Sequence, residues 1–489
     1  MLTKFTKSGI MCAEIPAGVK RRKRKAMKNR KWITPVVTVL IMIVIVVGAI
    51  TGRFKFTLND DGQSYSVASG IDLLMVLNVE IPDIYKGLPV TSIGEEAFRG
   101  CVFLTSIEIP DSIISIPYRA FCSCHSLTNI TIPDSVTIIG EEAFDNCESL
   151  TSIEIPDSVT SIGGLAFDGC SSLTSITIPD SVTSIGDYAF RGCSSLTSIE
   201  IPDSVTSIGA KAFDNCESLT SVVIPDSVTS IGSGAFSYCT SLTSIEVDIE
   251  NKYYKSIDEN LYTIDGKELV QYAVGKTDTS FTIPNYVTSI DGRAFVGCHS
   301  LTSVVIPDSV TSIDGTAFYS CYSLIEVCNK SSLDIAAGRS NYGYVDKYVK
   351  HIITDESETY LRYVGDYVFY DDGTDIYLVK YTGNETNLTL PEYDGGKQYK
   401  IHDYAFYDNA KITKVIIPDS VTSIGDYVFY KCSSLASISI GDSVTSIGEC
   451  AFLGSTSLII YCEAKSKPSG WSSDWNSNKR LVVWGYKGN

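Results

Sequence analysis

The chain has 489 residues, of which 44% are hydrophobic and 20% charged, and its formal net charge at pH 7 is −18. Residues 1–53 contain 12 Lys and Arg beside the single acid Glu14, so the rest of the chain holds 27 basic and 56 acidic side chains. A body this acidic repels phosphate backbones and anionic lipid surfaces, and we therefore expect no nucleic acid among its partners.

The first element is a basic segment, residues 1–31, followed by an uncharged apolar run, residues 32–52. A run of about twenty apolar residues matches the thickness of a bilayer core, and the preceding Lys and Arg favour a cytoplasmic N-terminus. We predict a transmembrane helix that contacts the membrane through residues 33–51 and places the body outside the cell. The small residues Val47-Gly48-Ala49 also fit a cleavage site, so a cleaved signal and a secreted body is the alternative.

A 23-residue repeat occupies most of the body. Within one unit, SLTSIEIP (149–156) alternates apolar and polar residues, which predicts a short strand that ends at its proline. SVTSIG (158–163) predicts a second short strand, in which we expect Gly163 to adopt unusual backbone angles. GLAFDGC (164–170) predicts one helical or 3₁₀ turn with Ala, Phe and Cys buried. Phenylalanine marks twelve such units in three runs, at Phe98, Phe121, Phe144, Phe167, Phe190, Phe213 and Phe236, at Phe295 and Phe318, and at Phe406, Phe429 and Phe452.

One unit cannot fold alone, because its few buried side chains stabilise it by less than the entropy that 23 ordered residues lose. Neighbouring units must cover both of its faces, with equivalent residues stacked at roughly 5 Å per turn. The fold class expected from this pattern is a β-rich solenoid of about twelve repeats, with short strands and tight turns.

The pattern L-x-x-I-x-I-P-x-x-V-x-x-I-G-x-x-A-F-x-x-C resembles the BspA-like class of leucine-rich repeat over most of residues 88–323 and 402–459. The resemblance implies a curved solenoid and a surface protein associated with adhesion to host proteins or other cells. The sequence departs from the commonest leucine-rich repeats because Pro-Asp-Ser-Val stands where their asparagine column would be.

Interruptions of the repeat divide the body into two predicted modules. Residues 53–354 form the first capped module, and its insertion, residues 248–282, is predicted to be a β-hairpin around Asp265-Gly266. Residues 355–489 form the second, with a lead-in, three repeats and a C-terminal cap.

Three columns of polar or reactive residues raise the question of chemistry. Cysteines recur three residues after the phenylalanines. They are interpreted as buried free thiols, with disulfides or a metal site as alternatives, although parallel side chains suit neither geometry. Aspartates follow the prolines, where turn capping or a divalent cation would account for them. The four histidines are scattered, and His125 and His299 merely fill the variable position after the cysteine, so we expect neither catalysis nor a cofactor.

The remaining candidates are surface positions. The outward positions of the first strand form a polar, acidic face of hydroxyls and carboxylates, and aromatic residues gather in the insertion and the C-terminal segment. The candidate partner-binding residues are Glu108, Glu154, Glu200 and Glu246 on the face, Tyr253, Tyr254, Tyr262 and Tyr272 in the insertion, and Trp471 and Trp475 near the C-terminus.

These observations favour a non-enzymatic leucine-rich repeat protein at the cell surface that mediates adhesion or binds an extracellular protein or glycan. A structural spacer or envelope scaffold without a dedicated ligand is the alternative. The candidate glutamates could equally belong to a solvated sheet, and the tryptophans to the core of the cap.

Overall fold

The computed structural model describes residues 54–70, 77–335, 345 and 349–487, which belong to one compact unit. The predicted basic segment and transmembrane helix, residues 1–31 and 32–52, lie outside the described residues. Among the residues that are described, no helix is long and apolar enough to cross a membrane.

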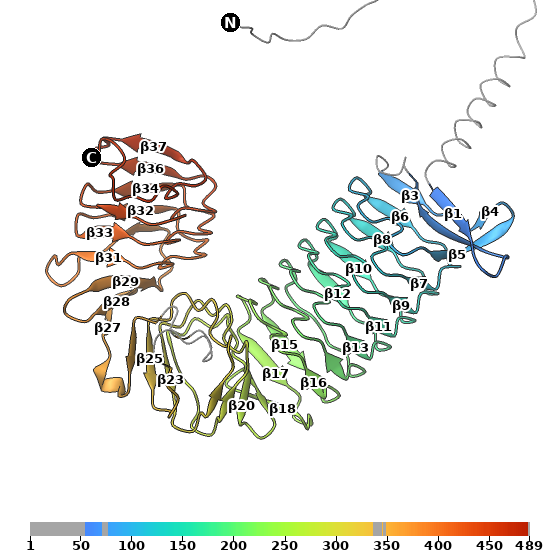
Figure 1. Cartoon of the computed structure of the whole chain (residues 1–489), viewed down its shortest axis with the longest axis horizontal. Coiled ribbons are helices and arrows are strands. Elements are labelled where there is room, and N and C mark those ends of the chain that lie inside the picture. The colour runs from blue at the N-terminus through green and yellow to red at the C-terminus, as the bar shows by residue number, and fades with distance from the viewer. Residues whose placement is uncertain (1–53, 71–76, 336–344, 346–348, 488–489) are drawn as a thin grey trace, which may run out of the picture. The chain divides into compact units, whose positions relative to one another are not determined.

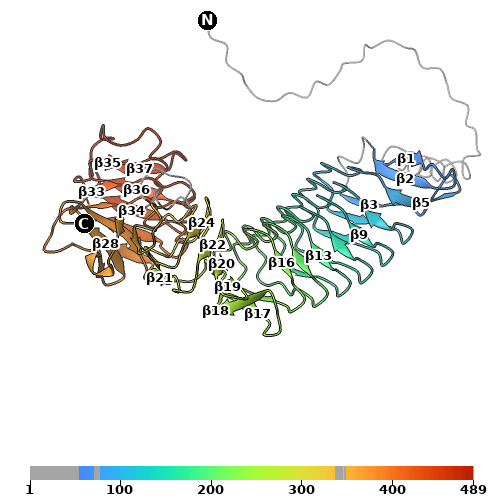
Figure 2. The same ribbon diagram turned by 60° about the horizontal axis from the view of Figure 1, so that its bottom comes forward.

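Most repeats make one turn of a β-solenoid with two short strands, as the sequence predicts, whereas no strand is assigned to residues 196–202 of one turn. The strand that precedes the proline is called the main strand, and the strand that precedes the glycine is called the second strand. Figure 1 shows the two series following each other along the stack, and Figure 2 shows β9, β13 and β16 of the second series from another side. Some turns lack the phenylalanine marker, so the stack has more turns than the twelve that the marker counts.

The main strands are β3 (Asn78–Glu80), β6 (Ser106–Glu108), β8 (Asn129–Thr131), β10 (Ser152–Glu154), β12 (Ser175–Thr177), β15 (Ser221–Ile224), β17 (Ser244–Val247), β21 (Ser280–Thr282), β23 (Ser303–Ile306), β25 (Glu326–Asn329), β26 (His351–Ile353), β30 (Asn387–Thr389), β32 (Lys414–Ile417), β34 (Ser437–Ile440), β36 (Ile459–Cys462) and β37 (Leu481–Trp484). The second strands are β5 (Leu88–Ile93), β7 (Ser115–Ile116), β9 (Ile138–Ile139), β11 (Ser161–Ile162), β13 (Ser184–Ile185), β14 (Ser207–Ile208), β16 (Ser230–Ile231), β20 (Glu268–Gln271), β22 (Ser289–Ile290), β24 (Ser312–Ile313), β29 (Ile376–Tyr381), β31 (Tyr399–Ile401), β33 (Val421–Ile424) and β35 (Ser446–Ile447).

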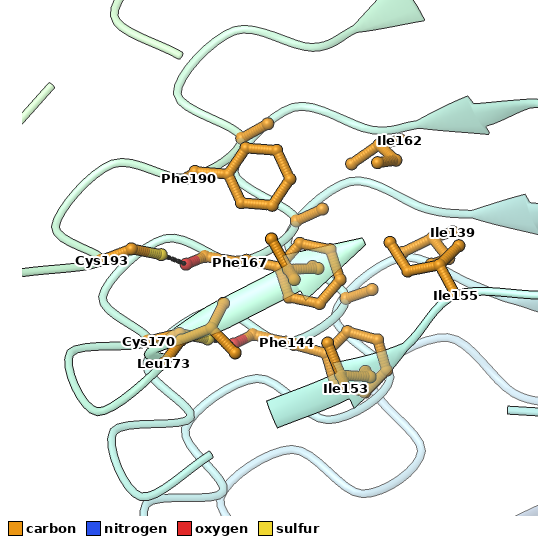
Figure 3. Close-up of a cluster of buried hydrophobic side chains, with 14 of the residues drawn as sticks. Ile139, Phe144, Ile153, Ile155, Ile162, Phe167, Cys170, Leu173, Phe190 and Cys193 are labelled. Atoms are coloured by element: carbon orange, nitrogen blue, oxygen red, sulfur yellow. Dashed lines mark hydrogen bonds between the residues drawn. The ribbon is translucent and has the colours of Figure 1, made fainter. Parts of the chain in front are cut away.

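Neighbouring turns pair in parallel with equivalent residues opposite each other. Ile153 lies opposite Ile176 in the main sheet, and Ile162 lies opposite Ile185 in the second sheet. Consecutive phenylalanine rings from Phe98 to Phe236 stack with centroids 5.3–5.5 Å apart and ring planes within 8° of parallel. Figure 3 shows three of these rings above one another beside the isoleucines. The predicted stacking of identical side chains is therefore confirmed.

The segment around each phenylalanine is a chain of tight turns, and the prediction of one helical or 3₁₀ turn is wrong there. Ala166 and Asp168 donate amide hydrogen bonds to residues three positions earlier, but Phe167 between them donates to Ala189 of the next turn at 2.7 Å. Leu165 and Gly169 have φ of 57° and 68°. These left-handed residues interrupt any helix and point every second amide at the neighbouring turn. The one short 3₁₀ helix assigned in the described residues is η2 (Glu356–Glu358).

The glycine that follows most second strands of the first run is required for a reason other than the predicted one. Gly163 does not appear among the residues with positive φ. A Cβ atom on Gly163 would lie 2.6 Å from the amide nitrogen of Glu141, and one on Gly186 would lie 2.5 Å from the amide nitrogen of Gly164. The backbones of adjacent turns approach so closely at these two glycines that a Cβ atom would have to displace backbone atoms, although Pro117, Asp291 and Asp314 stand at the same position of other turns.

The cysteine column is built from buried thiols, which confirms the favoured interpretation. Eight thiols of the column donate to the carbonyl of the phenylalanine 26 residues earlier, as from Cys170 to Phe144 and from Cys193 to Phe167, both at 3.3 Å (Figure 3). Ser455 stands at the same repeat position and makes the same bond to Phe429 at 3.1 Å. All fourteen cysteines of the described residues are free.

Additional strands lie before the first turn, between the runs and at their ends. They are β1 (Phe54–Leu58), β2 (Tyr65–Ser69) and β4 (Ile84–Tyr85) near the start, β18 (Tyr254–Ile257) and β19 (Asn260–Thr263) in the insertion, and β27 (Leu361–Val364) and β28 (Tyr367–Asp371) before the third run. In the insertion, β18, β19 and β20 pair antiparallel, and Asp265-Gly266 lies between β19 and β20. β20 then pairs in parallel with β22 and so returns the chain to the stack.

The close approach at the glycines that follow the second strands predicts that the same substitution has different effects at two of them. Gly186→Ala should lower the free energy of unfolding by about 1–3 kcal/mol, because the new methyl group must displace backbone atoms. Gly94→Ala at the same repeat position should change it by about 0.5 kcal/mol or less, since there the nearest atoms lie 3.6 Å from the new Cβ. Thermal unfolding of both variants checks this, and equal midpoints would contradict it.

Burial predicts which thiols react. It raises the pKa of Cys147, Cys193, Cys216 and Cys239 well above the ordinary value, so the reactive thiolate is suppressed. Cys450 is the one described cysteine that is only partly buried. Alkylation of the native chain at pH 8 should modify Cys450 first, and the buried thiols only after unfolding without a reductant. Buried thiols that stay unmodified after unfolding would indicate disulfides instead.

Candidate functional site

The main-strand face of the first run carries the candidate glutamates in a regular column. Glu108, Glu154, Glu200 and Glu246 are all exposed. Glu108 pairs in register with Thr131, and Glu154 pairs with Thr177, so a carboxylate and a hydroxyl alternate over these turns, whereas Val223 pairs with Glu246 further along. We call this series, residues 108, 131, 154, 177, 200, 223 and 246, the acidic column.

A serine column runs beside it on the same face. Ser152, Ser175, Ser198 and Ser221 are exposed, and none of their hydroxyls has a hydrogen-bond partner within the described part of the chain. The threonines before them behave differently, because they donate to the main chain of the preceding turn, as Thr174 does to Thr151 at 3.2 Å. The serine hydroxyls are therefore free to bond to a ligand.

Two adjoining hollows mark the N-terminal end of this face. One has a volume of about 790 Å³ and is lined by β3, β6 and β8, including Glu80 and Glu108. The other, about 330 Å³, shares Asn129 and Thr131 with it and extends to Glu154. No Lys or Arg lines either hollow. The face can therefore accept hydrogen bonds and attract cationic groups.

The structure removes two of the four insertion tyrosines from the candidate site. Tyr262 and Tyr272 are each 1% exposed, so neither ring can contact a partner. Tyr272 stacks on Phe295 at 5.2 Å and takes the phenylalanine position of an additional turn. Tyr272 lies 23 residues before Phe295, which is one repeat length, so the sequence itself contained the signal that places it in the core. Tyr254 is half-buried and its hydroxyl accepts a hydrogen bond from the Ile231 amide, whereas Tyr253 is 50% exposed.

The tryptophans belong to the core of the C-terminal end. Trp471 and Trp475 are 3% and 6% exposed, and their ring centroids lie 4.7 Å apart. Trp475 packs edge-on against Phe452, the last phenylalanine of the third run, at 5.9 Å. The indole of Trp471 donates to the Val444 carbonyl at 3.1 Å. Cap packing, the alternative weighed for these residues, therefore describes them, and neither ring offers a binding platform.

Within the described part of the first run, the aspartates after the prolines accept no capping hydrogen bond, contrary to the expected turn capping. In the first run the neighbouring serine forms the stabilising bond, as Ser158 does to the Val136 carbonyl at 2.5 Å. In the third run, carboxylate oxygens of Asp419, Asp442 and Glu463 lie within 4.8 Å of one another, and all three residues are exposed. Stacking of identical turns thus brings like charges together, as the spacing predicts.

A second polar site, which the sequence did not indicate, lies between the second and third runs. Lys380 on β29 donates to the carbonyl of His299 and to the hydroxyl of Ser323, at 3.2 Å for the latter. None of the ion pairs among the described residues includes Lys380. Lys380 also lines a cavity of about 380 Å³ together with Ser300, Asp408 and Lys411.

Lys380 and His299 are half-buried residues, and the desolvation of their charged groups changes the titration of this site. Desolvation lowers the pKa of Lys380 to about 8, and desolvation together with the positive charges of Lys380 and Lys431 lowers the pKa of His299 to about 3. Tyr322 and Tyr404 stack nearby with centroids 4.0 Å apart, and Lys431 pairs with Glu217 at 3.1 Å. The contacts join residues of all three runs, which explains why no local pattern shows them.

The lowered pKa predicts a pH-dependent contribution to stability. In the unfolded chain Lys380 keeps its proton up to its ordinary pKa of 10.5, whereas in the folded chain it loses it near pH 8. Its burial therefore destabilises the fold fully below pH 8, and this penalty decreases as the pH rises toward 10. The thermal midpoint of Lys380→Met minus that of the parent chain should accordingly decrease between pH 7.5 and 9.5.

Lys411→Met is the control for that measurement, because Lys411 is exposed. Its difference from the parent chain should stay constant over the same pH range. Comparing variants cancels the opposite effect of the buried thiols and tyrosines, which are common to all three proteins. A constant difference for Lys380→Met would contradict the assignment.

The comparisons with known proteins agree with this architecture. The family model described as "BspA type Leucine rich repeat region (6 copies)" matches residues 91–185, 160–264, 271–393 and 398–467. None of the curated proteins compared with the chain matches it significantly.

Several solved structures are similar to the chain. A leucine rich cell surface protein from Faecalibacterium prausnitzii is 30% identical, with 90% of this chain and 97% of that one covered and a TM-score of 0.48. A leucine-rich repeat protein from Bacteroides ovatus is 26% identical, with 88% and 98% covered and a TM-score of 0.47. A leucine-rich repeat protein from T. pallidum is 32% identical, with 39% of this chain and 88% of that one covered and a TM-score of 0.36. The repeat pattern, its stacking and the extent of the family match together show that the chain belongs to the BspA-type leucine-rich repeat family.

Proposed function

We propose that the chain is a non-enzymatic cell-surface protein that binds an extracellular protein or glycan through the main-strand face of its first run. The observation that carries the proposal is the pair of adjoining hollows lined by Glu80, Glu108 and Glu154, which are exposed and without a basic neighbour on the hollow walls. Hollows concentrate contact area, and carboxylates with free hydroxyls supply directed hydrogen bonds.

The N-terminal sequence supports an exported body. The basic segment followed by the uncharged run of residues 32–52 is the pattern of a membrane anchor or an export signal. An anchored body would display the face to other cells or to a matrix, and a cleaved one would carry it into the medium. Tyr253, which is 50% exposed, is a further contact candidate beside the far end of the face.

The test compares two double variants of the full chain displayed on cells, probed against arrays of extracellular proteins and glycans. Glu108→Gln with Glu154→Gln changes the hollows, and we expect it to lower binding about threefold or more because it removes two ligand-facing charges. Glu95→Gln with Glu141→Gln removes the same charge from exposed turn positions. This control should bind as the parent chain does.

Two results would oppose the proposal. Equal binding by the two double variants would show that the hollows are not the site. Failure of the displayed parent chain to bind any array component would favour the alternative, a structural spacer whose repeats provide reach alone.

A further inference from the structure

We infer that the cavity between the second and third runs binds a sugar that carries a carboxylate group, with Lys380 as the cation that recognises this group. The cavity shares no residue with the main-strand face of the first run, so it is a second binding site that does not depend on the proposed function. The inference follows from a half-buried lysine without an ion pair in the described part of the chain, from the unpaired polar groups around it and from the size of the cavity.

Three segments of the chain build this cavity, which has a volume of about 380 Å³. Thr277, Thr279 and Ser300 precede the main strands β21 and β23, residues 380–384 lie at the end of β29, and residues 405–411 surround the first phenylalanine of the third run. Small-molecule sites have volumes of roughly 300–1,000 Å³, so this cavity is at the lower end of the range. It therefore suits a ligand of one or two sugar rings.

The ammonium group of Lys380 lies beside the cavity wall. It donates to the carbonyl of His299, the residue bonded directly to Ser300 of the wall, and to the hydroxyl of Ser323 at 3.2 Å. An ammonium group has three N–H donors, so one of them remains without a partner among the described residues. No carboxylate of those residues forms an ion pair with Lys380. The third donor is therefore available to a ligand.

Other covered lysines of the chain do have a counter-ion. Lys276, whose side chain is 13% exposed, pairs with Glu259 at 3.1 Å, and Lys431 pairs with Glu217. A charge removed from water is costly unless an opposite charge pairs with it. Desolvation lowers the pKa of Lys380 to about 8, which shows that its surroundings disfavour the charged form. An anionic group at the third N–H would supply the counter-charge that the described residues do not.

The neutral groups of the wall suit a ligand with several hydroxyl groups. The hydroxyls of Thr277, Thr279 and Ser300 have no hydrogen-bond partner within the described residues, and none of the three residues is buried. The side-chain oxygen of Asn384 accepts a hydrogen bond from the Lys411 ammonium at 2.7 Å, which leaves the amide group of Asn384 as a donor. Because sugar hydroxyls both donate and accept, they can pair with all of these groups at once.

One carboxylate on the wall favours a sugar acid over a simple anion. Asp408 lines the cavity and forms no ion pair among the described residues. Its negative charge repels an inorganic anion, but it accepts hydrogen bonds from hydroxyl groups. Lys380 and Lys411 supply two positive charges on the same wall. A ligand with one carboxylate and several hydroxyls satisfies both kinds of group.

The experiment measures binding of small sugars to the full chain in a neutral detergent at low salt and at pH 7, where Lys380 is protonated. The sugar acids are methyl glucuronide and N-acetylneuraminate. Methyl glucoside is the matched neutral probe, because it differs from the glucuronide only by a hydroxymethyl group in place of the carboxylate, and sulfate is the simple anion. We expect one of the sugar acids to bind about tenfold or more tightly than the glucoside and sulfate, since a hydrogen bond to a charged group is stronger than a neutral one.

Variants locate the contact. Lys380→Met should weaken binding of the sugar acid about tenfold and remove its advantage over the glucoside. Thr279→Ala with Ser300→Ala should weaken binding of both probes about twofold to fivefold, because it removes neutral hydrogen bonds only. Lys414→Met removes a charge from an exposed position of β32 outside the cavity, and this control should bind both probes as the parent chain does. Thermal midpoints verify that each variant is folded.

Equal affinities for the sugar acids and the glucoside would overturn the inference, because the carboxylate would then not be recognised. Sulfate that binds as tightly as the sugar acids would indicate an unspecific anion site, and absence of sugar-acid binding would show that the cavity takes no such ligand. An advantage of the sugar acid that persists in Lys380→Met, or an equal loss in Lys414→Met, would reject the role of Lys380. None of these results changes the array measurement on the first run, so the two sites are tested separately.

Discussion

The structure depends on one constraint, the vertical alignment of equivalent residues in successive turns. Every second amide around the phenylalanines donates to the next turn, as Phe144 does to Ala166 at 2.8 Å, and Gly163 donates to Ile139 at 2.9 Å. These bonds fix the turns so closely that a methyl group at Gly186 would have to displace backbone atoms. Near-identity of the repeats follows, because each side chain must pack against a copy of itself.

Sequence periodicity predicted what this constraint controls. The two strands, the buried phenylalanines and the buried thiols follow from apolar spacing, and the structure places them as expected. The turn conformation was predicted wrongly, because Glu96, Arg119 and Leu165 adopt left-handed angles although their residue types give no sign of it. The role of glycines such as Gly163 was misinterpreted for a related reason, since the sequence of one repeat does not indicate how closely the backbones of adjacent turns approach.

The candidate site was predictable only for residues that occupy the same position in successive repeats. The glutamates lie on one face because their register equals the period, whereas the tyrosines and tryptophans were chosen by residue type and are mostly buried. Tyr272 takes the place of a phenylalanine, which the 23-residue step reveals. The contact of Lys380 with His299 joins positions 81 residues apart, and no periodic signal connects them. Long-range contacts between runs therefore need the structure.

A stacked fold separates its core from its surface. The inward residues must repeat, but the outward positions of each main strand face solvent and are free to vary without loss of packing. The first run places Glu on every second turn with Thr or Val between, while the third run places Ile416 and Tyr461 at the same positions. Because the turns fix the distance between these positions, a choice of residue every 23 or 46 positions becomes a fixed spacing of charges in space.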